Sequence, residues 1–142
     1  MPLSDAQALD EIFELLQIAW NANEDSEDVP LLYEDTCQER PTSGAYALAG
    51  FYTVDVPRVT LSPHAQKRYT TVGIVTVQIR CPRGDGKTLA GQLAAVARDA
   101  FRGKRTANGV VFSRVRIKDA GIDGTYTLTN VIADFEFDSV GE

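Results

Sequence analysis

The chain has 142 residues, of which 44% are hydrophobic and 24% are charged, and this fits one globular domain spanning residues 1–142. No apolar stretch approaches the ~18 residues of a membrane span, and the N-terminal segment lacks the features of a secretion signal, so we expect neither insertion nor export. With one histidine and two cysteines, no structural zinc site can be assembled within one chain, and we expect reduced cysteines in an intracellular protein.

The charge of the chain is distributed unevenly along the sequence. Residues 1–39 carry eleven acidic and no basic residues, whereas residues 40–142 carry nine acidic and fourteen basic residues. One interpretation is a solvated acidic surface. The other is a pair of complementary faces that meet head to tail between copies of the chain. The overall charge of -6 argues against general nucleic-acid binding.

The first predicted element is a helix over residues 4–22. Ser4 and Gln7 have the spacing of a capping box at its start, and apolar residues at helical spacing form one stripe. An acidic loop follows, and then a short strand over residues 31–36. The stripe consists of Leu9, Ile12, Phe13, Leu16 and Trp20.

Two long extended segments come next, over residues 45–60 and 69–81. In the second, apolar and polar residues alternate with a period of two, which indicates a strand with one buried face. We expect a long hairpin whose tip is the intervening segment "LSPHAQKR". Pro57 predicts a sheet edge or a bulge late in the first strand.

The last elements are a helix over residues 87–102, ended by Gly103, and strands over residues 109–118 and 125–138. The segment "DAGIDG" joins these two strands and contains Asp-Gly, a hairpin signal. The order is therefore α-β-β-β-α-β-β. The alternation predicts an α+β fold with a largely antiparallel or mixed sheet and two helices packed on one face.

The turn before the second helix raises the question of nucleotide binding. Gly86-Lys87-Thr88 matches the end of the phosphate-binding motif G-x-x-x-x-G-K-[ST]. The first glycine of that motif would fall at Cys81, and Pro82 lacks a backbone N–H in a loop that works by presenting N–H groups. The glycines equally suit a tight turn between strand and helix, which is the interpretation we favour.

Other candidate chemistry is limited to a row of carboxylates on the last strand. Asp134, Glu136 and Asp138 alternate with apolar residues, and such a row suits either cation binding or the wet side of a sheet. Asp134 also mimics the second motif of a nucleotide site. We favour the wet side, and we expect no catalytic residue, no metal and no cofactor.

The order of these segments resembles the tail terminator proteins of long-tailed bacteriophages. The likeness covers residues 5–138 and is weakest over residues 21–45. It is carried by "VGIVTVQIRCPRGDG", "KTLAGQLAAVARDAF", "NGVVFSRVRI" and "YTLTNVIADFEFD". Pro82, Gly84 and Gly86 occupy a Pro-x-Gly-x-Gly pattern between strand and helix.

The resemblance implies a structural virion protein and not an enzyme. Copies of the chain would form a ring, expected to be a homohexamer, that caps the tail tube, ends tube polymerisation and offers the head-joining surface. The implied partners are further copies, the tail tube protein and the head–tail connector or neck protein. DNA would pass through the lumen without specific binding, and no membrane is involved. The ring would assemble in the host cytoplasm and occupy the head-proximal end of the tail.

Three surface segments are the candidate interaction sites: the hairpin tip, the turn before the second helix and the acidic loop. The alternative for each residue is an ordinary solvated position. The candidates are Lys67, Arg68, Tyr69, Arg83, Asp85, Lys87, Glu24, Asp25, Glu27 and Asp28. The alternative functions are a head-closure, neck or minor tail protein, a small nucleotide-binding protein using the Gly86-Lys87-Thr88 turn, or an adaptor without a virion role.

Overall fold

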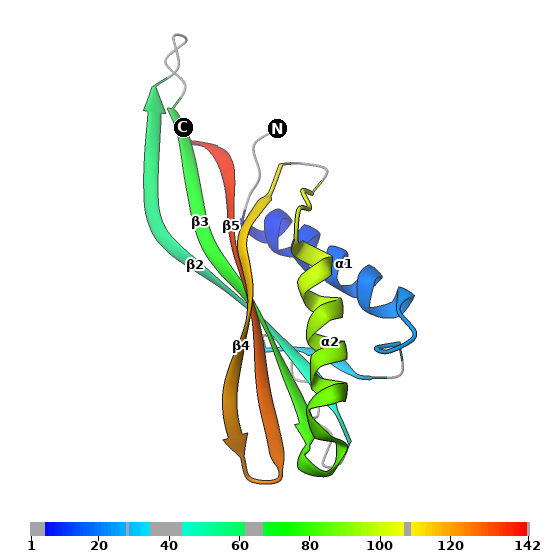
Figure 1. Cartoon of the computed structure of the whole chain (residues 1–142). Helices are drawn as coiled ribbons and strands as arrows, with labels where there is room; N and C mark the ends of the chain where they lie inside the picture. The colour runs from blue at the N-terminus through cyan, green and yellow to red at the C-terminus, as the bar shows by residue number, and fades with distance from the viewer. Residues whose placement is uncertain (1–4, 28, 35–43, 62–66, 107–108, 142) are drawn as a thin grey trace.

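The computed structural model of the chain describes residues 5–27, 29–34, 44–61, 67–106 and 109–141 (Figure 1). Two helices and five strands follow one another in the predicted order α-β-β-β-α-β-β, which confirms the α+β class. The elements are α1 (Asp5–Ala22), β1 (Leu31–Tyr33), β2 (Tyr46–Leu61), β3 (Lys67–Pro82), a 3₁₀ turn (Arg83–Asp85), α2 (Gly86–Phe101), β4 (Val111–Asp123) and β5 (Tyr126–Gly141).

The five strands form one mixed sheet in the spatial order β1-β2-β3-β5-β4. The short strand β1 pairs in parallel with β2, and all other neighbours are antiparallel. Strand β1 therefore lies at one edge of the sheet and β4 at the other. Both helices lie on one side of the sheet (Figure 1). At the end of the sheet near the C-terminus, β2, β3 and β5 extend together past the helices.

The alternation read from the sequence separates the two faces of the sheet. In β3, Val75, Val77 and Ile79 are fully buried toward the helices, while the residues between them are only partly buried. Strand β5 repeats the pattern, with Phe135 and Phe137 buried and Glu136 exposed. The period of two thus fixes which side chains meet the helices.

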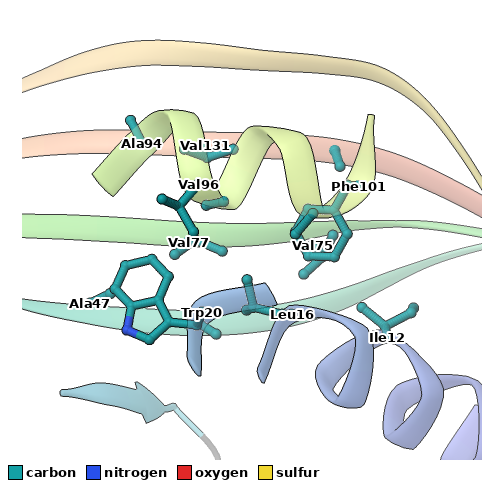
Figure 2. Packing of buried hydrophobic residues seen from close by; sticks show 14 of the residues in the cluster. Ile12, Leu16, Trp20, Ala47, Val75, Val77, Ala94, Val96, Phe101 and Val131 are labelled. Atoms are coloured by element: carbon teal, nitrogen blue, oxygen red, sulfur yellow. The ribbon is translucent and has the colours of Figure 1, made fainter. Parts of the chain in front are cut away.

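The helices bury their apolar stripes in this core. Ile12, Leu16 and Trp20 of α1 are buried, and α2 contributes Leu93 and Phe101. Helix α2 packs on β3, β5 and β4, whereas Figure 2 shows Leu16 and Trp20 of α1 on the β2 side of the core. The two helices thus divide the sheet between them, with α1 toward the β1 edge.

The predicted end of α2 lies within the described residues, whereas the predicted cap of α1 does not. Gly103 follows α2 with a φ of +68°, and the backbone N–H of Arg102 donates to the carbonyl of Arg98 at 2.9 Å, so the predicted glycine stop is confirmed. Ser4, the expected cap of α1, lies outside the described residues, as does Cys37. Cys81 is buried in the core.

The connection between β4 and β5 is shorter than the sequence predicts. Strand β4 continues to Asp123, so the connection to β5 is a tight turn at Gly124, whose φ is +62°. We predicted a longer loop, but a bulge between Asp119 and Gly121 lets the ladder continue.

In the β2–β3 hairpin the register shifts between Val54 and Arg58, which confirms the irregularity expected around Pro57.

Candidate functional site: assembly surfaces

The acidic loop that follows α1 has a defined conformation. Asn23 organises it, because its side-chain Oδ1 accepts from the N–H of Asp25 at 3.0 Å and its carbonyl accepts from the N–H of Glu27 at 2.9 Å. The side chain of Ser26 turns inward, has 0% exposure and donates to the carbonyl of Trp20 at 2.7 Å. The loop therefore keeps its one hydroxyl inside and its carboxylates outside.

The core anchors this loop through Trp20. The indole Nε1 donates to the carbonyl of Val29 at 2.8 Å, and the ring itself is 1% exposed. Glu24, Asp25 and Glu27 are all exposed. The fourth predicted acid, Asp28, lies outside the described residues.

Glu34 is a further acidic residue of this region. It lies directly after β1, at the β1 edge of the sheet. Its N–H donates to the carbonyl of Ala49 at 2.9 Å, and its carboxylate accepts from the hydroxyl of Tyr52 on β2. This hydrogen bond is the main cause of a raised pKa of Tyr52, with burial and the charge of Glu34 adding to it. The β1 edge thus ends in a carboxylate held by a neighbouring strand.

The turn before α2 is attached to the β4–β5 hairpin. The N–H of Arg83 donates to the carbonyl of Thr125 at 2.8 Å, and the side chain of Arg83 is exposed. Asp85 ends the 3₁₀ turn and Lys87 is the second residue of α2. The candidate residues of this segment therefore lie at the same end of the sheet as the β4–β5 turn.

The arrangement around Gly86-Lys87-Thr88 differs from that of a nucleotide-binding loop. Strand β3, which leads to the turn, has antiparallel neighbours on both sides, whereas phosphate-binding loops follow strands of a buried parallel sheet. Asp134 pairs with Ile74, eight residues or roughly 26 Å along β3 from Pro82. These observations favour the structural interpretation of the turn.

Lys67 and Arg68, which we expected in the hairpin tip ahead of a strand over residues 69–81, belong to β3 instead. They and Tyr69 pair with β2 on one side and with β5 on the other. The misplacement arose because the basic pair Lys67-Arg68 follows proline and polar residues in the sequence, which is typical of a loop. The candidate tip residue His64 lies outside the described residues.

Sequence reasoning missed a basic surface at the β4 edge. Residues 102–118 contain six basic and no acidic residues, and every one of the six side chains is exposed. The net charge of residues 40–142 alone does not reveal this run, but a window over the sequence would have found it. The six are Arg102, Lys104, Arg105, Arg114, Arg116 and Lys118.

The backbone of β4 is distorted within this basic run. Arg114 has a φ of +51°, and the register shifts between Ser113 and Arg116. Arg116 Nη1 lies 3.2 Å from Asp134 Oδ1, and Arg114 Nε lies 3.8 Å from Asp134 Oδ2. Asp134 thus belongs to an ion-pair cluster with two arginines on the face of the sheet away from the helices.

Another polar cluster, around Arg80, lies on the face of the sheet away from the helices, near the β4–β5 turn. The Arg80 guanidinium lies 5.7 Å from the ring centre of Tyr46 and 5.5 Å from that of Tyr126, and Arg80 Nη2 lies 2.6 Å from Asp123 Oδ2. Because the Arg80 side chain is 13% exposed, this cluster covers aromatic rings and joins the four strands β2, β3, β4 and β5, a structural role.

Large apolar side chains are exposed near both charged surfaces. Ile18 on α1 is 61% exposed, and Ile117 and Ile122 on β4 are 41% and 59% exposed. The two β4 isoleucines line a groove of about 380 Å³ between the β4–β5 hairpin and α2. Ile18 and Asp25 line a second groove, of about 460 Å³, between α1 and α2.

Within the described ranges, no group of three histidine, cysteine, aspartate or glutamate residues is arranged to hold a metal ion. Neither described helix combines the length and apolar character that a membrane crossing requires.

Comparison with known proteins places the chain in a family. The family model described as phage tail terminator protein matches residues 7–130, a range that runs from the first turn of α1 to the beginning of β5. The chain belongs to the phage tail terminator family. The resemblance seen in the sequence is therefore confirmed, and the family assigns the chain a structural role in the phage tail as a virion component.

The solved structures agree with this at the level of the fold. One of them superposes with a TM-score of 0.70 at 18% sequence identity, covering 99% of this chain and 97% of the other. At that identity the likeness shows a shared fold only. A search of curated protein sequences finds no match.

Proposed function

We propose that copies of this chain close into a ring on the head-proximal end of the tail tube and so end tube polymerisation. The observation that carries this proposal is that the two edges of one sheet bear opposite charge, acidic around β1 and basic along β4. The membership of the tail terminator family supports the terminating role.

Opposite charge on opposite edges favours head-to-tail contact between copies. Each copy would use a different surface toward each neighbour, which is the heterologous contact that generates closed rings. A symmetric dimer would instead bring two surfaces of like charge together, which is unfavourable. A ring of six copies matches what the sequence resemblance implies, and one face of such a ring would meet the tail tube protein and the other the head–tail connector.

The lumen of the ring would carry DNA without specific binding. Glu136 and Asp138 are exposed on the outer face of β5, and carboxylates on a lumen wall repel phosphate. In this proposal the chain acts by assembly alone and not as an enzyme, and the ring forms in the host cytoplasm before the head is joined.

The test is electron microscopy of lysates from a phage that lacks this reading frame. Abnormally long tails without heads are expected, and a plasmid copy of the native chain should restore normal length. Tails of normal length would contradict the terminating role. If such tails failed to join heads, a neck or head-closure function would replace it; intact particles would contradict any essential role in the tail.

A further inference from the structure

We infer that the basic edge of one copy docks against the acidic edge of the next copy. The basic edge consists of Arg105, Arg114, Arg116 and Lys118, along β4 and the segment bridged to it. The acidic edge consists of Glu24, Asp25, Glu27 and Glu34, around β1. This inference rests on the proposed ring and names the surfaces that would join its subunits.

The basic edge keeps an excess of positive charge despite nearby carboxylates. Its four cations are all exposed, and Arg105 is held beside the strand by a bridge to Val111. Three acids lie close by: Asp134 is shared between Arg114 and Arg116, Asp119 accepts from the N–H of Gly121 at 3.0 Å, and Glu136 on β5 pairs with Val111 on β4. Four cations against three anions leave a net charge of about +1 for a partner.

The segment that forms the acidic edge contributes no cation, and Lys104 is the basic residue that lines the same groove as Asp25. Residues 1–39 contain no lysine or arginine, and the exposed Glu24, Asp25 and Glu27 lie on a loop fixed from inside by Ser26. A loop already held in one conformation loses little conformational entropy on docking. The acidic edge is therefore suited to a specific contact with cations from outside the subunit.

Strands β1 and β4 lie far apart within one copy. The order β1-β2-β3-β5-β4 separates β1 from β4 by four strand spacings, or about 19 Å. Unit charges that far apart at a solvated surface are screened, because the Debye length is ~8 Å at physiological salt. The attraction between the edges becomes effective only when a second copy brings them into contact.

Apolar side chains accompany the charges on both sides, as a stable interface needs. Ile18 lies in the same groove as Asp25, and Ile117 and Ile122 line the groove beside β4. Docking would cover these exposed isoleucines and place the charges at the rim of the contact, where they set orientation and partner choice.

The distorted backbone at Arg114 favours side-chain docking over strand pairing. An edge strand offers unpaired N–H and C=O groups to any other strand, and bulges and charges block that pairing. Arg114 combines both devices, with a φ of +51° and a side chain that is 76% exposed. A strained residue of this kind often marks a functional surface, and here the strained residue is an exposed arginine.

Charge reversal with rescue tests the inference in tails assembled in the phage-infected cell. One variant carries Arg114→Glu, Arg116→Glu and Lys118→Glu, and the other carries Glu24→Lys, Asp25→Lys and Glu27→Lys. Each alone should reduce the number of normal-length tails at least tenfold, and the chain carrying all six changes should restore it. Asp10→Lys, at an exposed position of α1, is the control for a change of net charge away from both edges. Equal activity of all variants, or no rescue by chains that fold, would overturn the inference.

Cross-linking separates this inference from the proposed function. In a chain with Cys37→Ser, the pair Asp25→Cys and Lys118→Cys should give a ladder of covalent multimers in purified tails, and neither single cysteine should extend beyond a dimer. If the native chain ends tube growth but the pair gives no ladder, the interface is wrong and the proposed function stands. If the native chain fails to end tube growth, the proposed function is wrong, while a ladder would still support the interface.

Discussion

The carboxylate of Asp134 holds Arg116, with 3.2 Å between Oδ1 and Nη1. Arg116 Nη1 also donates to the carbonyl of Arg114 at 2.8 Å, so one arginine ties the β4 bulge to β5. This cluster fixes where two cations of the basic edge lie. The row of carboxylates on β5 is therefore not uniform, because Asp134 positions the arginines while Glu136 is exposed.

Replacing Arg114 by glycine should separate fold stability from assembly. Its φ of +51° lies in the left-handed region, where a side chain costs about 1–2 kcal/mol and glycine does not. Its ion pair with Asp134 is long and exposed, so losing it costs little. We expect Arg114→Gly to melt at the native temperature or higher and yet to support fewer normal-length tails.

Arg114→Ala is the matched control, because it removes the charge and keeps the Cβ. Its melting temperature should not exceed that of the native chain, while its tail phenotype should match that of Arg114→Gly. A glycine variant that melts well below the alanine variant would show that the backbone strain is not relieved as argued.

Gly73 in β3 should tolerate no side chain. A Cβ there would collide with the ring of Phe135 on β5 and with the carbonyl of Tyr52 on β2, at a place where three strands are in register. Overpacking of this kind costs typically ~1–3 kcal/mol, so Gly73→Ala should lower the free energy of unfolding by about that amount in urea titration.

Gly91 provides the opposite case. Nothing lies within 4 Å of a Cβ added there, and Gly91 is inside α2, where alanine is favoured by roughly 0.5–1 kcal/mol. Gly91→Ala should therefore raise the free energy of unfolding in the same titration. Equal effects of the two substitutions would contradict the packing around Gly73.

Ser26 should contribute to the stability of the fold and to the conformation of the acidic loop. Its buried hydroxyl donates to the carbonyl of Trp20 at 2.7 Å, and leaving that carbonyl without its partner should cost about 1–2 kcal/mol. We expect Ser26→Ala to lower stability by that amount and to speed hydrogen exchange of the Glu27 amide. Unchanged exchange at Glu27 would show that the loop is held in another way. Ser113→Ala, at an exposed serine of β4, should change neither quantity.

The elements and the buried face were predictable from local pattern. Alternation in β3 and β5, the stripe on α1 and the glycine after α2 each depend on neighbouring residues, which is information that the sequence carries directly. The prediction was less accurate where pairing between distant strands decides the outcome. The residues around Lys67 are typical of a loop, but pairing with β2 and β5 places it in a strand.

The candidate surfaces were predictable only in part for the same reason. The acidic loop was evident from composition, whereas the basic edge depends on β4 lying at the end of the sheet, a result of strand order. The role of Asp134 depends on a bulge that brings Arg114 and Arg116 to the same carboxylate. Strand order and bulges follow from the whole fold, and no single segment encodes them.

Alkaline pH should loosen the attachment of β1 to β2. Burial raises the pKa of Tyr33, and the hydrogen bond to Glu34 raises that of Tyr52, both from an ordinary value of 10.0. A folded-state pKa above the unfolded value means that the neutral form stabilises the fold below pH 10 and that this stabilisation is lost as pH rises through the folded value. Over a urea titration series from pH 9 to pH 11, the free energy of unfolding should therefore fall as pH rises above the ordinary value of 10.0.

Substitution by phenylalanine assigns this pH dependence to the two hydroxyls. The Tyr52→Phe chain should lose less stability over the same pH range than the native chain, because no phenolate can form beside Glu34. Tyr33→Phe should remove the part due to burial, and the chain with both substitutions should show the flattest profile. If all four chains lost the same free energy of unfolding between pH 9 and pH 11, other groups would govern the alkaline transition. The hydrogen bond between Tyr52 and Glu34 would then not contribute to it.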